Sequence, residues 1–291
     1  METLKKNLYK LYFTLPALTL VSLFFIIPNI LNFYFAFTDW TPYRDEILFR
    51  GFRNFIELTQ DKMIWRDLWT TLKFALSVCI IQNFIALCLA LALEKDSRFN
   101  TVLRTIFFIP VVFSPLAAGY IFRGFLNSRG TINTIIQAMT NSNIKIPFLG
   151  SVVWTLFVLA FIHSWHWFGI SMLVYIAGLK LVPNELIEAA VVEGARGWTL
   201  ISKIKIPLII PSFTFNIIVT FIGTFSAFEM PLIMTKGGPG RSTEVLNMFV
   251  FQNFGLGRWS YATAIGLVIF ILVCIFAIPM IILLRKREVE L

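Results

Sequence analysis

The sequence of 291 residues contains little charge, only three cysteines and only two histidines. Charged residues make up 14% of the chain, whereas a soluble domain carries about 25%. The cysteines, Cys79, Cys88 and Cys274, lie within apolar runs and have neither CxxC spacing nor an extracellular position. A disulfide framework and a redox motif are therefore excluded, and we interpret the three thiols as packing residues.

The motifs of common catalytic sites are also missing. No GxxxxGK[ST] loop is present, and KGGPGRST at residues 236–243 has the wrong glycine spacing and the wrong terminal residue for a phosphate loop. No HExxH motif occurs, and the two histidines have no convincing set of metal co-ligands. No nucleophile can be paired with a general base. We therefore expect a non-catalytic chain that binds no metal and no cofactor of its own.

Long apolar runs dominate what remains, and 57% of the residues are hydrophobic. Six runs are essentially free of charge, and each reaches the roughly 18 residues that a helix needs to cross a bilayer. The short alternating segments of membrane strands do not occur. We predict an all-α integral membrane protein with one transmembrane domain, residues 1–291, whose six spans are residues 11–37, 74–93, 105–122, 148–179, 206–235 and 261–284.

The first run follows three lysines, as the apolar part of a signal peptide would. It is much longer than a signal-peptide core and is not followed by a small-residue cleavage site, so we interpret it as a span. Basic residues flank both ends of the chain, which suits an even number of spans and cytoplasmic termini. The net charge of +9 then reflects topology and contact with anionic lipid headgroups, and we expect no nucleic acid partner.

The loop at residues 180–205 is unusually polar for this chain and lies between the fourth and fifth predicted spans. Pro183 suits the first turn of a helix, and Glu185 and Glu188 would compensate the helix dipole. Three- and four-residue spacings would place one set on a shared helical face: Ala189, Ala190, Glu193, Gly194 and Gly197. Because two glycines weaken a helix, we expect a turn and then a second short helix over residues 198–206. Such a helix–turn–helix fits a cleft in a cytoplasmic partner better than it fits a simple linker.

This loop closely resembles the EAA loop of permease subunits from bacterial ABC importers. The family pattern runs roughly GLQxIPxELxEAAxxDGAxxxxxFxxIxLPxxxP, and the matching positions are Gly178, Leu179, Pro183, Glu185, Leu186, Glu188, Ala189, Ala190, Gly194, Ala195, Ile204, Pro207 and Pro211. Lys180, Glu193 and Ile201 depart mildly from the usual Gln, Asp and Phe. The segments TDW, GFRNF, RTIFFIP and KGGPG resemble the carbohydrate-type subgroup, which includes the maltose and glycerol-3-phosphate permeases.

The resemblance implies the six-helix fold of type I ABC importer permeases, with a cytoplasmic coupling helix between spans four and five. It implies a multi-pass chain of the inner (cytoplasmic) membrane that pairs with a second permease subunit and two ATPase subunits. An extracytoplasmic solute-binding protein would deliver a carbohydrate or related polyol, and the ATPase would use the ATP and Mg²⁺. The residues expected to couple to the ATPase are Glu185, Glu188, Ala189, Ala190, Glu193, Gly194, Ala195 and Gly197.

Polar and aromatic residues inside the spans are candidates for substrate contact, because ionisable groups at mid-bilayer rarely face lipid. The fourth span contains His163, Trp165, His166 and Trp167, which could contact a sugar or could serve interhelical packing equally well. Glu229 is the only carboxylate in any predicted span, and an interfacial acid or a salt bridge is an equal alternative to substrate contact. Thr220 and Thr224 lie on nearby turns. The resemblance adds Ser114, because spans three to five line the sugar site in that family.

Other functions stay open on the sequence alone. The chain could be an importer permease for a solute other than a carbohydrate. An ion-coupled secondary transporter would need its own coupling carboxylates and usually internal repeats over more spans. Six spans with one intramembrane acid argue against that reading. A membrane scaffold would leave the EAA loop unexplained.

Overall fold

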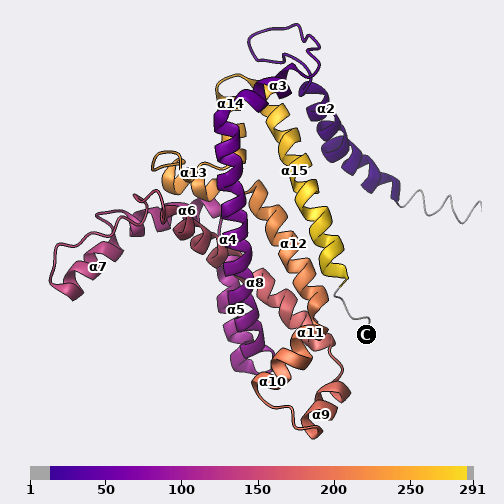
Figure 1. Ribbon diagram of the computed structural model, residues 1–291, viewed down its shortest axis with the longest axis vertical. Coiled ribbons are helices and arrows are strands. Elements are labelled where there is room, and N and C mark those ends of the chain that lie inside the picture. The colour runs from indigo at the N-terminus through magenta and orange to yellow at the C-terminus, as the bar shows by residue number, and fades with distance from the viewer. Residues whose placement is uncertain (1–13, 287–291) are drawn as a thin grey trace, which may run out of the picture. The chain divides into compact units, whose positions relative to one another are not determined.

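A computed structural model describes residues 14–286 of the chain (Figure 1). Regular structure within these residues is helical, apart from an isolated antiparallel bridge between Thr38 and Phe49. The predicted all-α class is therefore confirmed. The described residues divide into two compact units, a first unit of residues up to 64 with 249–270 and a second unit of residues 65–248 with 271 onwards. The prediction of one transmembrane domain stays a prediction.

Four described helices are long and apolar enough to cross a membrane by themselves: Thr14–Phe35, α4 (Lys62–Leu93), α8 (Thr155–Leu181) and α15 (Trp259–Arg285). The first of these consists of an α-helical stretch over residues 14–21, a π-helical segment at Ser22–Ile26 and α2 (Ile27–Phe35). Two bent helix pairs also pass the same test when each pair is taken as one span, so the count rises to as many as the predicted six. Residues 11–13 of the first predicted span, and the lysines before it, lie outside the described residues.

The predicted third span, residues 105–122, is not one continuous helix. Instead, two residues separate α5 (Arg98–Val112) from α6 (Pro115–Leu126), and α5 and the Pro115–Thr140 segment meet at a bend of 94°. The break has a local cause. Pro115 disfavours a helical conformation at the residue before it, and Ser114 is extended with ψ of 134°. The range predicted for the third span therefore contains a break between two helices.

The predicted fifth span, residues 206–235, is divided as well. A helical arm runs from Trp198 to Leu208 and comprises α10 (Trp198–Leu200), a π-helical segment (Ile201–Lys205) and α11 (Ile206–Leu208). It meets α12 (Ile210–Ser226) at a bend of 68°. Pro211 lies in the first turn of α12 and has no N–H with which to continue the preceding helix. The last part of the prediction forms a separate helix, α13 (Glu229–Thr235).

The boundaries of the other two spans in the second unit also differ from the predictions. α4 begins at Lys62, well before the expected residue 74, so this helix extends beyond its apolar run at the N-terminal end. In contrast, α8 begins at Thr155, since turns occupy most of residues 148–154. Four shorter helices complete the described chain: α3 (Arg53–Gln60), α7 (Thr131–Thr140), α9 (Asn184–Val192) and α14 (Leu246–Gly255).

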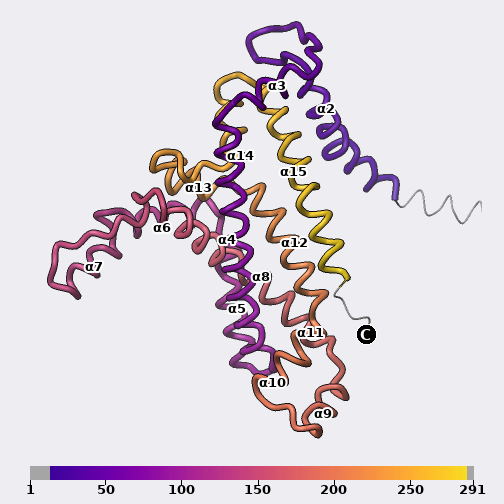
Figure 2. Tube along the Cα trace, viewed as in Figure 1, coloured from indigo at the N-terminus to yellow at the C-terminus, as the bar shows by residue number. Residues whose placement is uncertain are grey.

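The second unit is organised around α8 (Figure 2). One apolar cluster joins α8 to α4, α6 and α13 through residues such as Leu159 and Phe74, and another joins α8 to α4 through Met172 and Ala86. Glycines permit the tightest approaches. A Cβ atom at Gly169 would lie 2.6 Å from the carbonyl oxygen of Phe107 on α5, so larger residues cannot fit there.

Polar contacts to backbone atoms and between side chains hold the first unit together. The buried Asn54 donates hydrogen bonds from Nδ2 to the carbonyl oxygens of Ala36 and Thr38, at 2.8 and 2.9 Å. The hydroxyl group of Tyr261 donates to Asp61 Oδ2 at 3.0 Å. These contacts fix the end of α2 and the following residues against α3 and the start of α15.

Candidate functional site

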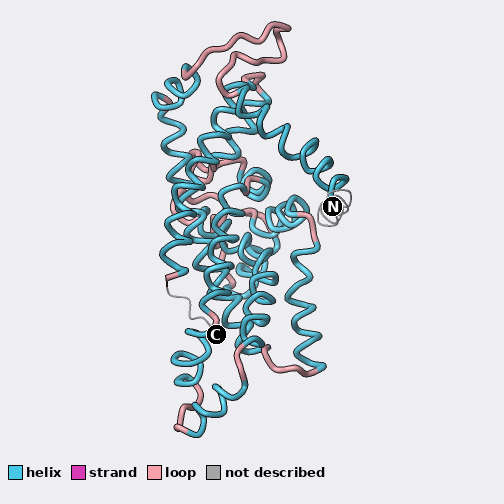
Figure 3. The backbone as a smooth tube through the Cα atoms, turned by 90° about the vertical axis from the view of Figure 1, so that its right-hand side faces the viewer, coloured by secondary structure: helices cyan, strands magenta, loops and turns pink. Residues whose placement is uncertain are grey.

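The loop at residues 180–205 forms the helix–turn–helix that the sequence predicts (Figure 3). Its first arm is α9 (Asn184–Val192), which begins directly after Pro183. Its second arm is the helical stretch from Trp198 to Leu208, and the two arms are joined by a turn. We call residues 180–205 the coupling loop.

Gly194 ends α9 in a Schellman motif. Its φ is +92°, and its N–H donates to the carbonyl oxygen of Val191, while the N–H of Ala195 donates to the carbonyl oxygen of Ala190 at 2.8 Å. This pair of bonds satisfies the last carbonyl groups of the helix and requires a residue that tolerates positive φ. Gly197 follows with φ of +52° and ψ of −122°, a conformation that glycine adopts with little cost.

The spacing of the two glycines predicts that they belong to a small-residue face of α9. In the structure they do not. They lie beyond the end of the helix, and a Cβ atom at either position would have nothing within 4 Å. Backbone conformation, and not close packing within the chain, explains them. The expectation of a turn at these positions is confirmed, and the expectation of a shared face is wrong for Gly194 and Gly197.

The remaining predicted coupling residues divide into an outer and an inner set. Ala190 is buried at 7% exposure, and Ala195 is half-buried. The outer set is exposed and consists of Glu185, Glu188, Ala189 and Glu193. Apolar side chains accompany the outer set, since Val192 and Trp198 are 87% and 73% exposed. The loop thus presents acidic and apolar groups together on a surface that no described residue covers.

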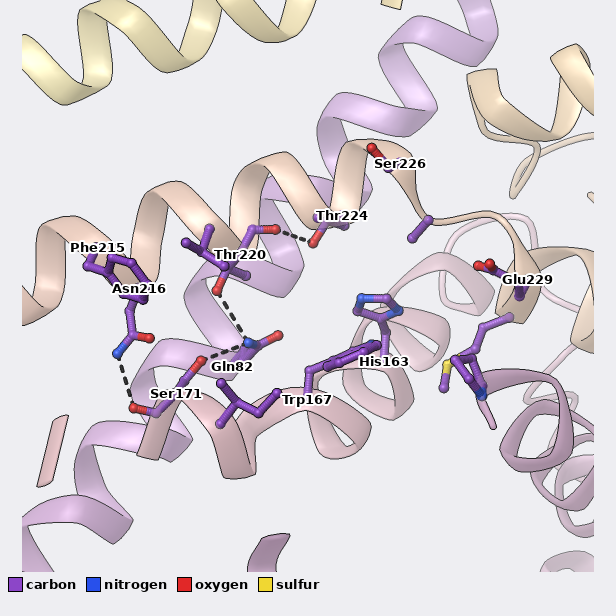
Figure 4. Close-up of a pocket in the computed structure, with 16 residues that line it drawn as sticks. Gln82, His163, Trp167, Ser171, Phe215, Asn216, Thr220, Thr224, Ser226 and Glu229 are labelled. Carbon is purple, nitrogen blue, oxygen red and sulfur yellow. Dashed lines mark hydrogen bonds between the residues drawn. The ribbon is translucent and has the colours of Figure 1, made fainter. Parts of the chain in front are cut away.

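A pocket of about 380 Å³ lies in the second unit between α4, α8, α12 and the start of α13 (Figure 4). Its volume is within the range of small-molecule sites. Five of the predicted substrate residues line it: His163, Trp167, Thr220, Thr224 and Glu229. His163 and Trp167 share a face of α8, as their four-residue spacing predicts.

Three residues that were predicted as candidates for substrate contact do not line the pocket. Trp165 points to another face of α8, where its ring packs against Phe122 at 5.0 Å. His166 is fully buried and lies edge-on to the ring of Trp167 at 5.0 Å. Ser114 lies immediately before Pro115, which lines the pocket, but Ser114 itself does not. These three residues therefore do not line this pocket, and their contact with a substrate stays a prediction.

A network of uncharged polar groups forms one side of the pocket. Gln82 donates from Nε2 to the hydroxyl oxygens of Ser171 and Thr220, at 2.9 and 3.2 Å. Asn216 donates from Nδ2 to the carbonyl oxygen of Ser171 at 3.0 Å, and the Thr224 hydroxyl donates to the carbonyl oxygen of Thr220. All five residues are buried, so their hydrogen bonds offset the cost of removing polar groups from water. The network connects α4, α8 and α12.

Sequence reasoning missed Gln82, Ser171 and Asn216. It weighed ionisable and aromatic residues and a few hydroxyl groups, but it passed over the neutral amides and the hydroxyl group of Ser171. A signal was present nonetheless, because Gln82 is one of only a few strongly polar residues in the run at 74–93. A buried amide in such a run needs partners from other helices, which makes it a candidate for an interhelical site.

Glu229 is the first residue of α13 and gives the pocket its single carboxylate. Its Oε2 accepts a hydrogen bond from the backbone N–H of Phe228 at 3.3 Å. It forms no ion pair with any residue that the structure describes, so the salt-bridge alternative is not realised within this part of the chain. No lysine or arginine lines the pocket beside it.

Comparison with known proteins relates this arrangement to a transport family. Residues 82–287 match the family described as binding-protein-dependent transport system inner membrane component. The probable starch degradation products transport system permease protein AmyD of Thermoanaerobacterium thermosulfurigenes is 28% identical, over 99% of this chain and 97% of that protein. The probable ABC transporter permease protein YurN of Bacillus subtilis (strain 168) is 30% identical, over 89% and 90%. The multiple sugar-binding transport system permease protein MsmF of Streptococcus mutans is 27% identical, over 99% and 100%.

Solved structures show the same fold. A bacterial ABC transporter involved in the import of the acidic polysaccharide alginate aligns with a TM-score of 0.83 at 20% sequence identity, over 98% of both chains. The same kind of transporter in complex with an alginate pentasaccharide-bound periplasmic protein aligns with a TM-score of 0.81. The importer permease fold implied by the EAA loop is thereby confirmed. Because the family match extends over most of the sequence, this chain belongs to the binding-protein-dependent transport system inner membrane components.

Proposed function

We propose that this chain is the non-catalytic membrane subunit of an ATP-driven importer and that its cargo is a carbohydrate or related polyol. The chemistry of the pocket is the observation that supports this class of cargo. Trp167 and Phe215 offer ring faces for sugar C–H groups, and the amides and hydroxyls beside them can exchange hydrogen bonds with sugar hydroxyls. The relatives named for starch degradation products and multiple sugars support the same class.

The coupling loop is the proposed contact with the ATPase. Its outer surface combines Glu188 with the exposed Val192 and Trp198, which suits insertion into a groove of a soluble partner. The second permease subunit would complete the translocation pathway, and an extracytoplasmic binding protein would deliver the cargo. In this proposal, the chain lies in the inner membrane and both of its termini lie in the cytoplasm. ATP binding would then move the loop and switch the paired permeases between two access states.

Reconstitution tests this function directly. The chain, its partner permease and the ATPase would be co-expressed, purified and placed in vesicles, with the binding protein added on one side. Sugar uptake is expected to require both ATP and the binding protein. Uptake that follows an ion gradient without the ATPase would refute the proposal. Uptake of a different class of solute under the same requirements would support the importer function and refute the carbohydrate cargo.

A further inference from the structure

Both ends of the coupling loop are attached to one short turn between α4 and α5. We call residues 94–97 the α4–α5 turn. Lys180, in the last turn of α8, places its Nζ atom 2.7 Å from Oδ1 of Asp96. Lys205, at the far end of the loop, forms an ion pair with Glu94. The partners are 84 and 111 residues apart in the sequence, so only the fold brings the two lysines to the same turn.

The two attachments differ in burial. The side chains of Glu94 and Lys205 are 20% and 13% exposed, so loss of either would leave a charge largely out of water. Asp96 is 72% exposed, and its single pair with Lys180 would contribute little alone. Arg104 adds a second cation at 3.3 Å. Hydrogen bonding from Lys180, followed by that from Arg104, lowers the pKa of Asp96 below its ordinary value and keeps it ionised.

Arg104 also connects the α4–α5 turn to α5. Its guanidinium group, on α5, donates hydrogen bonds to the carbonyl oxygens of Leu93, Glu94 and Lys95. These are carbonyl groups at the end of α4 that have no partner within the helix. The turn that receives the two lysines is therefore fastened to both α4 and α5.

The helices that carry the loop are themselves closely packed. A Cβ atom at Gly178, near the end of α8, would lie 2.1 Å from Oγ of Ser212 on α12. The approach of α8 to α5 at Gly169 is similarly tight. Only the middle of the loop projects away from these helices, with α9 at the lower end of the second unit in Figure 1. A force on α9 can therefore reach the helices through the ends of the loop.

We propose that Glu94 and Asp96 are positioning residues that lock both ends of the coupling loop to the α4–α5 turn, so that movement of α9 is passed to α4 and α5 together with α8 and α12. The inference rests on the proposed docking of α9 to an ATPase. It adds the route by which that movement reaches the pocket. Gln82, Ser171 and Thr220 extend from α4, α8 and α12, so a joint displacement of these helices changes the pocket itself.

The test distinguishes the docking of α9 to the ATPase from the transmission of its movement to the membrane helices. Glu94→Gln and Asp96→Asn, singly and combined, remove charge with little change of shape. In the reconstituted complex, ATPase co-purification and ATP hydrolysis are expected to persist. The amount of sugar imported per ATP hydrolysed is expected to fall by roughly 5- to 150-fold in the combined variant, the usual range of coupling between sites. Lys203→Gln is the matched control, because Lys203 is exposed on the same arm and forms no ion pair with described residues.

A reversed pair provides the rescue. Glu94→Lys should uncouple transport from ATP hydrolysis. Combining it with Lys205→Glu should restore the amount of sugar imported per ATP hydrolysed, whereas a general loss of stability would not be reversed by the second substitution. If the Glu94→Gln variant does not insert into the membrane, the reversed pair is sufficient to test the inference. A normal ratio in the combined charge-removal variant would overturn the inference, and so would a reversed pair that assembles and stays uncoupled. Failure of the unaltered chain to co-purify with the ATPase would instead overturn the proposed function.

Discussion

Gln82 on α4 donates a hydrogen bond from Nε2 to the hydroxyl oxygen of Ser171 on α8 at 2.9 Å, and the same nitrogen also reaches Thr220 on α12. One buried side chain thus joins three helices beside the pocket. Gln82→Leu should remove both bonds and leave the two hydroxyl groups without this donor. Interhelical hydrogen bonds in membranes contribute about 0.6 kcal/mol on average, so the two together should contribute about 1 kcal/mol.

The expected result is a lower melting temperature of the purified chain and weaker sugar binding. Gln60→Leu provides the comparison, because Gln60 is exposed at the end of α3. Equal melting temperatures for Gln82→Leu and Gln60→Leu would show that the network does not stabilise the helix packing.

Substitution of Gly194 should weaken ATPase binding through the backbone of the coupling loop. Its φ of +92° is costly for a residue with a Cβ atom, by about 1–2 kcal/mol. Gly194→Asn should retain more ATPase in co-purification than Gly194→Val, because asparagine tolerates this region better. Gly124→Ala is the control, since it lies in α6 with open space around its Cβ position. Full ATPase retention by Gly194→Val would contradict the role of the turn.

Glu229→Gln should change the charge preference of the pocket. With one carboxylate and no lysine or arginine among its lining residues, the pocket should disfavour acidic sugars. Contact between like charges costs several kcal/mol, so removing this carboxylate should raise the relative affinity for a uronate-containing oligosaccharide at least about tenfold. Binding of neutral and acidic oligosaccharides of equal length to the purified permease pair would measure this ratio. An unchanged ratio would show that Glu229 does not face the cargo.

The ion pair of Asp96 with Lys180 predicts a specific response to pH. The pKa of Asp96 is lowered from its ordinary value of 3.8, first by the hydrogen bond from Lys180 and then by that from Arg104. The contribution of the ionised Asp96 carboxylate to the stability of the fold is therefore complete above pH 3.8, declines as the pH falls further, and is lost below the lowered pKa. The melting temperatures of the original chain and of Asp96→Asn, compared across pH, should differ by a constant amount at neutral and mildly acidic pH. A difference that disappears above pH 5 would contradict the contact.

Much of the coupling loop was predictable because its conformation is locally determined. Pro183 directly precedes α9, and Gly194 and Gly197 supply the positive φ values that separate the two arms. The resemblance of these residues to the EAA pattern then pointed to the transport family that the comparisons show. The pocket was predicted less completely. Spacing along α8 correctly paired His163 with Trp167, but no rule of spacing revealed that His166 faces away.

By itself, the sequence determined the all-helical membrane class, because a chain crossing a bilayer must satisfy its backbone hydrogen bonds internally and its apolar runs are long enough to do so. It also determined the turn of the coupling loop, since glycine and proline act on their own backbone. Proline likewise accounts for the breaks at Ser114 and Ile209, whereas only the tertiary structure decided which polar residues meet in the pocket. It also decided that Glu94 and Asp96 receive the two lysines of the coupling loop. Contacts between residues so far apart in the chain depend on how the helices pack, which no local pattern records.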